Sequence, residues 1–292
     1  MQNETRTEFR EVEIAPTLAA IERLQRDRGY RDSRGLFFIE GIRNFIAALD
    51  HSFSVDTLLY SEKLLIHPLA RKLVRRLKRA GVPFARVTPE QFRRVSKTER
   101  ASGVAAILRQ RVHRLDQVQV TDDACWTALS HVRSLGNFGM LMRTSAATGA
   151  AGFFLLGDSI DPFDPAVVRA TMGALFKQMI VRTSIDQLRQ SLRMNKVNVI
   201  GASPDGAEDY REVSYSRPAL LMLGSERKGL TEEQRGICKR LVRITMVEGM
   251  DSLNVAVAGS LLMYEVFGSQ GASGRRRKQK VPMKEIKEKG TD

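Results

Sequence analysis

The chain has 292 residues, of which 42% are hydrophobic and 27% are charged, a balance typical of a globular protein rather than a disordered one. No apolar run approaches the roughly 20 residues that a membrane-spanning helix needs, so no membrane partner is expected. Residues 1–16 lack the apolar core of a secretion signal, and we therefore expect a cytoplasmic protein.

The sequence contains two cysteines and four histidines, and neither set has the spacing of a metal site. Cys125 and Cys238 are expected to be reduced thiols. We expect no structural zinc, no other metal site and no histidine-based catalysis. Neither a phosphate-binding G-x-x-x-x-G-K-[ST] motif nor a G-x-G-x-x-G motif after a strand is present, which argues against an NTPase and a nicotinamide enzyme.

Positive charge is concentrated in two segments of a chain whose net charge is +14. Residues 63–100 contain 12 Lys and Arg against 2 Asp and Glu, and residues 275–292 contain 8 against 3. This concentration suits a polyanion partner, and nucleic acid is the best candidate. For residues 63–100 RNA contact is favoured over a surface that only promotes solubility. For the second segment both alternatives stay open.

The first part of the chain, residues 1–110, alternates strand and helix signals and predicts a compact α/β domain. Strands are expected at 35–41, 55–61, 82–88 and 102–110, and helices at 42–50 and 67–81. Leu69, Leu73, Val74 and Leu77 are expected to share one face of the second helix, which ends at Gly81. Its other faces carry the best candidates for RNA contact, which are Arg71, Lys72, Arg75, Arg76, Lys78 and Arg79.

The remaining chain is expected to form a linker at 111–124, a second domain at 125–268 and a disordered basic tail at 269–292. Strands are expected at 125–132, 152–157, 196–203, 218–224 and 241–246, and helices at 137–150, 164–175 and 184–195. Apolar strands alternating with helices predict a mostly parallel sheet that is covered on both faces.

The first stretch with the character of a site is SLGNFGMLMRTSAATG, at residues 134–149, where a strand meets a helix. Ligand sites of parallel sheets lie at the carboxyl ends of their strands. Asn137 is expected to cap the helix. Gly139 shares a face with Arg143 and is expected to leave open space beside it. Taken alone, each residue is best explained by an ordinary role, Asn137 as a plain helix cap and Arg143 as a solvated surface charge.

Two further stretches have a similar character. In LLMLGSERKGL, at residues 220–230, an apolar strand breaks at Gly224, which would let a ligand approach the backbone. Taken alone, this stretch is better explained as an ordinary strand-to-helix turn. In VEGMDSLNVAVAGS, at residues 247–260, a polar turn leads into an apolar helix that Asp251 and Ser252 are expected to cap. A stripe of small residues follows in that helix, and close packing is its favoured explanation.

In order and spacing, the three stretches together resemble the motifs of the SpoU (TrmH) branch of the SPOUT methyltransferase superfamily. The family pattern N-x-G-x-x-x-R-T is matched by Asn137, Gly139, Arg143 and Thr144. The pattern L-G-[NS]-E-x-x-G-[LI] is matched by Leu223, Gly224, Ser225, Glu226, Gly229 and Leu230. The pattern I-P-M followed by S-L-N-V-[SA]-x-A is matched by Ile244, Met246, Ser252, Leu253, Asn254, Val255, Ala256 and Ala258. Thr245 replaces the family's proline, which indicates a slightly different strand exit.

The resemblance, which covers about residues 126–268, implies a fold and a reaction. The implied fold is an α/β SPOUT domain whose C-terminal segment threads a loop to form a deep trefoil knot, an exception to ordinary topology. Residues 30–110 are similar to the small α/β RNA-binding domain, related to a ribosomal protein fold, that often precedes it. The implied reaction transfers a methyl group from S-adenosylmethionine to a ribose 2′-hydroxyl of RNA. A homodimer and a ribosomal RNA substrate, rather than tRNA, are expected from the same resemblance.

The resemblance also implies roles for individual residues. Arg143 would grip the adjacent phosphate and stabilise the developing alkoxide, because a guanidinium does not readily give up its proton. The residues that would position Arg143 and the ribose are Asn137, Glu226, Ser252 and Asn254. Those that would bind the cofactor are Gly224, Ile244 and Leu253 through backbone groups, with Ala202 and Met246 as weaker candidates.

Two functions remain open from the sequence, an RNA 2′-O-methyltransferase and a non-catalytic RNA-binding module with the SPOUT fold. The enzyme is favoured because a binding module need not keep Arg143, Glu226 and Asn254. A DNA-binding protein is a weaker alternative, since neither a helix-turn-helix nor zinc spacing is visible. Whether such an enzyme serves housekeeping or antibiotic resistance is left open.

Overall fold

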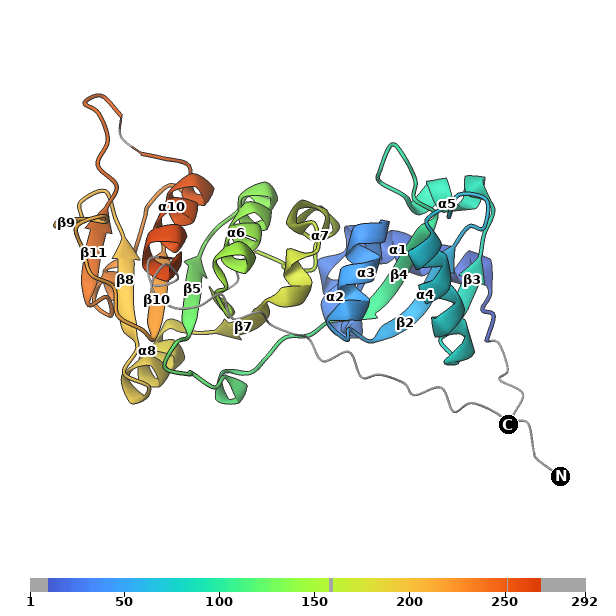
Figure 1. Cartoon of the computed structure of the whole chain (residues 1–292), viewed down its shortest axis with the longest axis horizontal. Coiled ribbons are helices and arrows are strands. Elements are labelled where there is room, and N and C mark those ends of the chain that lie inside the picture. Colours follow the sequence, from blue (N-terminus) through green and yellow to red (C-terminus); the bar gives the residue numbers. More distant parts are fainter. Residues whose placement is uncertain (1–9, 158–159, 251, 269–292) are drawn as a thin grey trace, which may run out of the picture.

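The computed structural model describes residues 10–157, 160–250 and 252–268, so the tail expected at 269–292 lies outside the described residues. Figure 1 shows two α/β units next to one another along the long axis of the molecule. The first third of the chain forms one unit, and the C-terminal helix α10 (Val255–Gly268) belongs to the other.

The described part of the first unit contains a four-stranded sheet in the order β1-β4-β2-β3. Its strands are β1 (Leu36–Glu40), β2 (Val55–Tyr60), β3 (Phe84–Arg86) and β4 (Val104–Arg109). Strand β4 is antiparallel to both of its neighbours, whereas β2 and β3 are parallel. The helices are α1 (Ile14–Arg26), α2 (Arg28–Arg34), α3 (Ile42–Asp50), α4 (Pro68–Arg79) and α5 (Pro89–Val95).

Alternating side chains of the strands divide the first unit into two hydrophobic layers. Phe37 packs with residues of α3 and α4, and its neighbour Phe38 packs with residues of α1 and α5. The strands and the helices α3 and α4 were predicted correctly, and Gly81 closes α4 with a left-handed φ of 78°. Leu69, expected on the buried face of α4, is 45% exposed.

The described part of the second unit contains a seven-stranded sheet in the order β7-β6-β5-β10-β8-β11-β9. Every pairing in it is parallel, which confirms the predicted architecture. Its strands are β5 (Cys125–Ser130), β6 (Gly152–Leu156), β7 (Met179–Thr183), β8 (Asn198–Ala202), β9 (Glu208–Asp209), β10 (Ala219–Leu223) and β11 (Arg240–Arg243).

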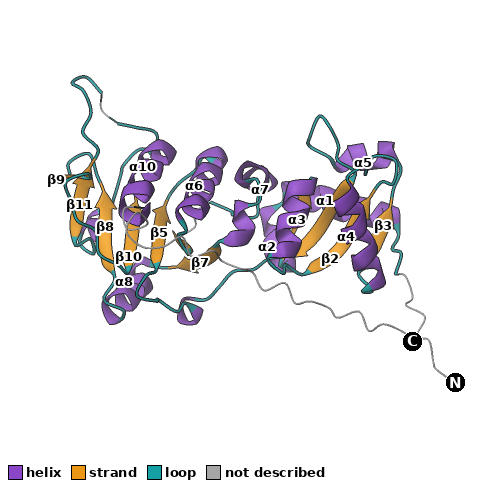
Figure 2. Ribbon diagram, viewed as in Figure 1, coloured by secondary structure: helices purple, strands orange, loops and turns teal. Residues whose placement is uncertain are grey.

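Helices cover both faces of this sheet, as Figure 2 shows. Helices α6 (Leu135–Thr148), α7 (Pro165–Thr171) and α10 lie on one face, and α8 (Ile185–Met194) lies on the other. Short elements complete the unit, namely η1 (Leu115–Gln117), η2 (Ala174–Lys177) and α9 (Glu232–Arg235). The helix expected at 164–175 is broken, because Met172 and Gly173 adopt left-handed φ angles of 51° and 93° between α7 and η2.

The segment expected to link the two units, residues 111–124, packs along the edge strand β7. The backbone N–H of His113 donates to the carbonyl of Ile180 at 2.8 Å. Leu115, Val118 and Val120 pack against the hydrophobic layer under α8. The segment is therefore held against the second sheet, while the exact limits of the two domains stay a prediction.

One hydrophobic cluster is shared by both units. Phe37 of β1 lies 4.8 Å from Phe163 of the second unit, measured between ring centroids. Phe53 meets Phe176 edge-to-face at 5.0 Å. These four rings are all buried, so the two units are joined by a continuous core rather than by a solvated contact.

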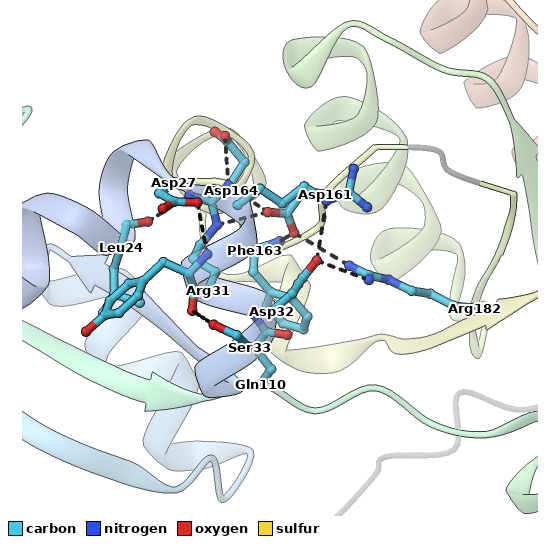
Figure 3. A network of polar contacts seen from close by, with 12 residues as sticks. Leu24, Asp27, Arg31, Asp32, Ser33, Gln110, Asp161, Phe163, Asp164 and Arg182 are labelled. Atoms are coloured by element: carbon cyan, nitrogen blue, oxygen red, sulfur yellow. Dashed lines mark hydrogen bonds and ion pairs between the residues drawn. The ribbon is translucent and has the colours of Figure 1, made fainter.

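A buried network of charges joins the same two units (Figure 3). Arg31 of α2 is 2% exposed and donates from Nε and Nη2 to Asp161 Oδ2 at 2.9 and 2.7 Å, and Asp161 is 5% exposed. Arg31 Nη1 donates to the carbonyl of Leu24 at 2.7 Å. Arg182 of β7 lies 3.6 Å from Asp32 and 3.8 Å from Asp161. The network fixes one orientation of the units, because breaking it would leave buried charges unpaired.

We expect Arg31→Ala to lower the free energy of unfolding by about 3–5 kcal/mol, the cost of removing one partner from a buried ion pair. Arg189→Ala is the matched control, because Arg189 pairs with Asp186, whose side chain is 74% exposed. It should cost at most about 1 kcal/mol. Denaturant unfolding of the wild-type protein and the two variants measures both losses of unfolding free energy. Equal losses in Arg31→Ala and Arg189→Ala would contradict a structural role for the buried network.

Candidate functional site

The carboxyl ends of β5, β8, β10 and β11 lie at one edge of the larger sheet. After β5 the chain proceeds to β6 and β7 on one side of the sheet, whereas β10, β8 and β11 lie on the other side. Strands β5 and β10 are nevertheless neighbours, so the strand order reverses between them. Ligands of open parallel sheets bind at such a switch point, outside the carboxyl ends of the strands.

Three polar side chains from distant parts of the chain meet there. Asn137, in the first turn of α6, donates from Nδ2 to Glu226 Oε1 at 2.5 Å. Its Oδ1 accepts from Asn254 Nδ2 at 3.2 Å. Asn137 thus uses both halves of its amide, one toward the turn after β10 and one toward the start of α10.

The helix caps differ from those expected. Helix α6 is capped by Ser134, whose Oγ accepts from the backbone N–H of Asn137 at 3.2 Å. This arrangement leaves the side chain of Asn137 available for its contacts with Glu226 and Asn254. Helix α10 begins at Val255, and Asn254 caps it by accepting from the N–H of Ala256 at 2.8 Å. The expectation that Asn137 caps α6, and that Ser252 caps a helix from Leu253, was wrong.

A cavity of about 430 Å³ lies beside this polar cluster. Its lining includes all five residues expected to hold a cofactor, which are Ala202, Gly224, Ile244, Met246 and Leu253. Glu226 and Ser252 line it as well. The structure therefore gathers residues from the ends of β8, β10 and β11 and from the loop before α10 around one space.

The tight turn after β10 requires the glycine at its start, Gly224. The N–H of Ser225 donates to the carbonyl of Gly229 at 2.9 Å, and the reverse bond measures 3.0 Å. A Cβ on Gly224 would lie 2.1 Å from the carbonyl carbon of Gly229. Gly224 was expected to admit a ligand, but the close approach that requires it is that of the chain's own backbone. This tight turn places Glu226 next to Asn137.

Thr245, which stands where the family pattern has proline, is fixed by a hydrogen bond. Its Oγ1 donates to Asp209 Oδ2 at 2.6 Å. Asp209 also accepts from the backbone N–H and the Nε of Arg211, both at 3.0 Å. The Arg211 guanidinium, and then the Thr245 hydroxyl, hold the pKa of the Asp209 carboxyl well below its usual range. A side-chain contact thus constrains the exit of β11.

Arg143 does not lie within the polar cluster. It is an exposed residue of α6, and in the described structure no hydrogen bond or ion pair joins it to Asn137, Glu226, Ser252 or Asn254. It lines a groove between the two units and a shallow hollow between α6 and α10. The open space expected beside it at Gly139 is also absent, because a Cβ there would lie 2.4 Å from the Cβ of Ala170 in α7.

The predicted basic surface of α4 is present, and two of its residues are held by contacts within the protein, Lys78 and Arg71, whose Nε donates to the carbonyl of Leu65. Arg71, Lys72, Arg75, Arg76 and Arg79 are exposed. Lys78 is half-buried, where its Nζ lies 3.0 Å from Tyr60 Oη and 4.2 Å from the ring centre of Phe84. The five exposed cations form a surface that a polyanion can reach, whereas Lys78 also packs against the core.

Comparisons with known proteins agree with this geometry. Residues 126–264 match the SpoU rRNA Methylase family, and residues 16–106 match the MRM3-like substrate binding domain. Residues 126–264 belong to the SpoU family. A relative from Streptomyces viridochromogenes, a 23S rRNA (uridine(2479)-2'-O)-methyltransferase, is 29% identical over 85% of this chain and 88% of its own length.

Solved structures of two methyltransferases superimpose on most of the chain. The AdoMet-bound rRNA methyltransferase from Sinorhizobium meliloti has a TM-score of 0.80 and 29% identity, covering 89% of this chain and 98% of its own. The SpoU methyltransferase AviRb from Streptomyces viridochromogenes, in complex with AdoMet, has a TM-score of 0.78 and 27% identity, covering 89% and 99%. The fold predicted from the resemblance, an α/β SPOUT domain after a smaller α/β domain, is confirmed.

The site of this SpoU chain includes residues that the sequence did not single out. Asp205 and Arg235 both line the cavity. Arg235 donates from Nη2 to Ser203 Oγ at 2.9 Å and to Asp205 Oδ2 at 3.3 Å. The sequence contained a signal for Asp205, because the turn residues PDG at 204–206 directly follow the strand expected at 196–203 and therefore lie at the same sheet edge. Nothing in the sequence marks Arg235.

The described residues contain neither a metal-binding cluster nor a membrane-spanning helix. No group of three His, Cys, Asp or Glu among them is arranged to hold a metal ion. None of the described helices combines the length and the apolar character needed to cross a bilayer. The described cysteines, Cys125 and Cys238, are free thiols, and burial raises their pKa to about 11 and about 12 respectively.

We expect Gly224→Ala to lower the free energy of unfolding by about 1–3 kcal/mol, because the added methyl group cannot fit against the backbone of Gly229. Gly136→Ala in the first turn of α6 is the control, since its Cβ would meet nothing closer than 3.9 Å. That change should leave the stability unchanged or raise it by up to about 1 kcal/mol. Thermal or denaturant unfolding distinguishes the two, and a neutral Gly224→Ala would show that the turn can relax.

Proposed function

We propose that this chain is an S-adenosylmethionine-dependent RNA methyltransferase that transfers a methyl group to a ribose 2′-hydroxyl. The observation that carries the proposal is the hydrogen-bonded cluster of Asn137, Glu226 and Asn254 beside a cavity of about 430 Å³ at the switch point of the sheet. Membership of the SpoU family and the AdoMet-bound relatives support the choice of reaction and cofactor.

The cavity has the character that a nucleoside cofactor requires. Gly224, Ile244 and Leu253 lie outside the regular strands and helices, so their backbone groups are available to the adenine and the ribose. Ala202 and Met246 supply apolar contact. S-adenosylmethionine supplies a methyl group already activated on a sulfonium, and the protein orients the acceptor and stabilises charge.

In this proposal Arg143 holds the phosphate next to the acceptor ribose and stabilises the negative charge that develops on the 2′-oxygen. A guanidinium suits that role because it keeps its proton and presents a fork of donors. Asn137, Glu226, Ser252 and Asn254 position the ribose and the loop around it. The exposure of Arg143 on the face toward the groove supports a contact with RNA rather than with the cofactor.

Ribosomal RNA is the proposed substrate rather than tRNA, and the 23S rRNA enzyme from Streptomyces viridochromogenes supports this choice. The N-terminal domain, residues 1–110, would select the RNA, with the cations of α4 as its main contacts. The linker at 111–124 and the domain limit near residue 268 belong to the same proposal, as does a cytoplasmic location. The alternative stays a non-catalytic RNA-binding module.

A homodimer and a trefoil knot complete the proposal. The outer face of α6 and α10 exposes apolar side chains, with exposed fractions of 45% for Met140, 48% for Val257, 41% for Leu261 and 59% for Tyr264. A second copy of the chain would cover this face. Helix α10 packs closely on α6 and β10, because a Cβ on Gly259 would lie 2.6 Å from Leu141 and 2.8 Å from Leu223. The knot itself is proposed from the resemblance to the SpoU family.

The first test is calorimetric titration of the purified protein with S-adenosylmethionine, followed by transfer of a labelled methyl group to ribosomal RNA. We expect one site per chain. Arg143→Ala should slow transfer by about 10²–10³-fold, the effect of removing one donor to a developing oxyanion, and should leave cofactor affinity unchanged. Wild-type turnover in this variant would remove Arg143 from the mechanism. Absence of cofactor binding, also in the presence of RNA, would favour the RNA-binding module.

The dimer can be tested separately by a charge on the exposed helix face. We expect Leu261→Asp to yield monomers in sedimentation velocity experiments, because a carboxylate would be desolvated in the interface. Met194→Asp is the control, since Met194 is 77% exposed at the end of α8 on the opposite face of the sheet. An unchanged sedimentation coefficient for Leu261→Asp would mean that this face is not the interface.

A further inference from the structure

A groove of about 820 Å³ runs between the two α/β units. One wall comes from α3 and from His67 at the start of α4, and the other comes from α6 and residues 171–177. The groove therefore extends from the beginning of the basic helix of the first unit to Arg143 of the second. It is separate from the cavity beside Glu226, since no residue lines both.

Three cations face this groove from three different elements. They are Arg43 of α3, Arg143 of α6 and Lys177 of η2. All three are exposed, and none of them forms an ion pair within the part of the chain that the structure describes. Asp50 is the single carboxylate of the lining, so positive charge prevails along the groove.

One of the groove's two histidines, His51, does not change this balance. His51 lines the groove together with His67. Burial first, and then the nearby charge of Lys177, lower the pKa of His51, so its ring is uncharged at neutral pH. The positive charge of the groove consequently comes from Arg43, Arg143 and Lys177.

The two walls are held together at the position of Arg43. Its Nη1 lies 3.7 Å from Met172 Sδ across the contact between the units. Directly beside it, a Cβ on Gly173 would lie 3.0 Å from the Cβ of Ala47. With the Arg31 network on the same interface, these contacts keep the groove preformed, which reduces the cost of ordering it around a ligand.

We propose that this groove binds the phosphodiester backbone of the RNA strand between α4 and Arg143, and that Arg43 and Lys177 are positioning residues that contact its phosphates. The inference rests on the proposed function, because it names the path of that substrate. Cations suit the phosphates, and the apolar side chains of Ile42 and Ile46 in the same lining suit the bases and riboses of a single strand.

The test is the salt dependence of RNA binding by the full-length protein, measured by fluorescence anisotropy with a 20-nucleotide poly(U) probe and with large-subunit ribosomal RNA. We expect Arg43→Gln/Lys177→Gln to reduce the slope of log Kd against log salt by about 0.7 for each lost contact, or roughly 1.4 in total. In the transfer assay this variant should raise the KM for RNA more than it lowers kcat. Its affinity for S-adenosylmethionine should not change.

A matched control removes the same charge from the opposite face of the sheet. Arg193→Gln/Lys196→Asn lies at the end of α8, and Asn is chosen because Lys196 has a left-handed φ of 51°. This variant should retain the wild-type slope. Arg43→Lys should also retain it, because a phosphate contact requires the charge rather than the packing of the guanidinium.

An unchanged slope in the groove variant, or an equal loss in the groove and control variants, would overturn the proposal. A reduced salt slope in Arg43→Lys would also overturn the proposal, because it would assign Arg43 a packing role instead. These outcomes are distinct from a failure of the proposed function. A wild-type protein that binds RNA with groove-dependent slope but transfers no methyl group would contradict the enzyme and leave the groove in place.

Discussion

The parallel arrangement of the larger sheet is the constraint on which the site depends. Because every strand in it points the same way, the segments after β5, β8, β10 and β11 all emerge at one edge. Residues separated by 89 and 117 positions in the chain thereby come within hydrogen-bond distance, in the pairs Asn137–Glu226 and Asn137–Asn254. Asn137 can join both only because Ser134 caps α6 in its place. Because Ser134 is the cap, the start of α6 contributes the Asn137 side chain to the centre of the site.

Apolar periodicity predicted the sheet and most of its helices, because periodicity is a local property. The residues that line the cavity were predicted only from the resemblance to the SpoU family. What the sequence patterns missed depends on contacts between distant segments. Gly139 was interpreted as open space beside Arg143, and Gly224 as room for a ligand to approach the backbone. Both glycines are instead required by neighbouring protein atoms, the Cβ of Ala170 and the backbone of Gly229. The break between α7 and η2 at Met172, and the hydrogen bond of Thr245 to Asp209, likewise need the tertiary structure. The position of Arg143 outside the polar cluster could not be inferred from its spacing to Asn137 alone.

The interface between the two units fixes their relative orientation. Phe37, Phe53, Phe163 and Phe176 make one core out of two sheets, and the Arg31–Asp161 pair adds a directional contact that only one orientation satisfies. An apolar contact alone would permit sliding, since it has little angular preference. The combination gives the groove of Arg43, Arg143 and Lys177 fixed walls.

This fixed interface has a geometric consequence for substrate choice. Because the two units share a core, the separation between the cations of α4 and the polar cluster at Asn137 cannot adapt to different RNAs. For the RNA path proposed above, this fixed separation would select an RNA by the distance between the stretch held by α4 and the acceptor ribose. Such selection by length would tolerate changes of base identity but not insertions or deletions between the two points. An enzyme with a flexible connection between its units would show the opposite tolerance.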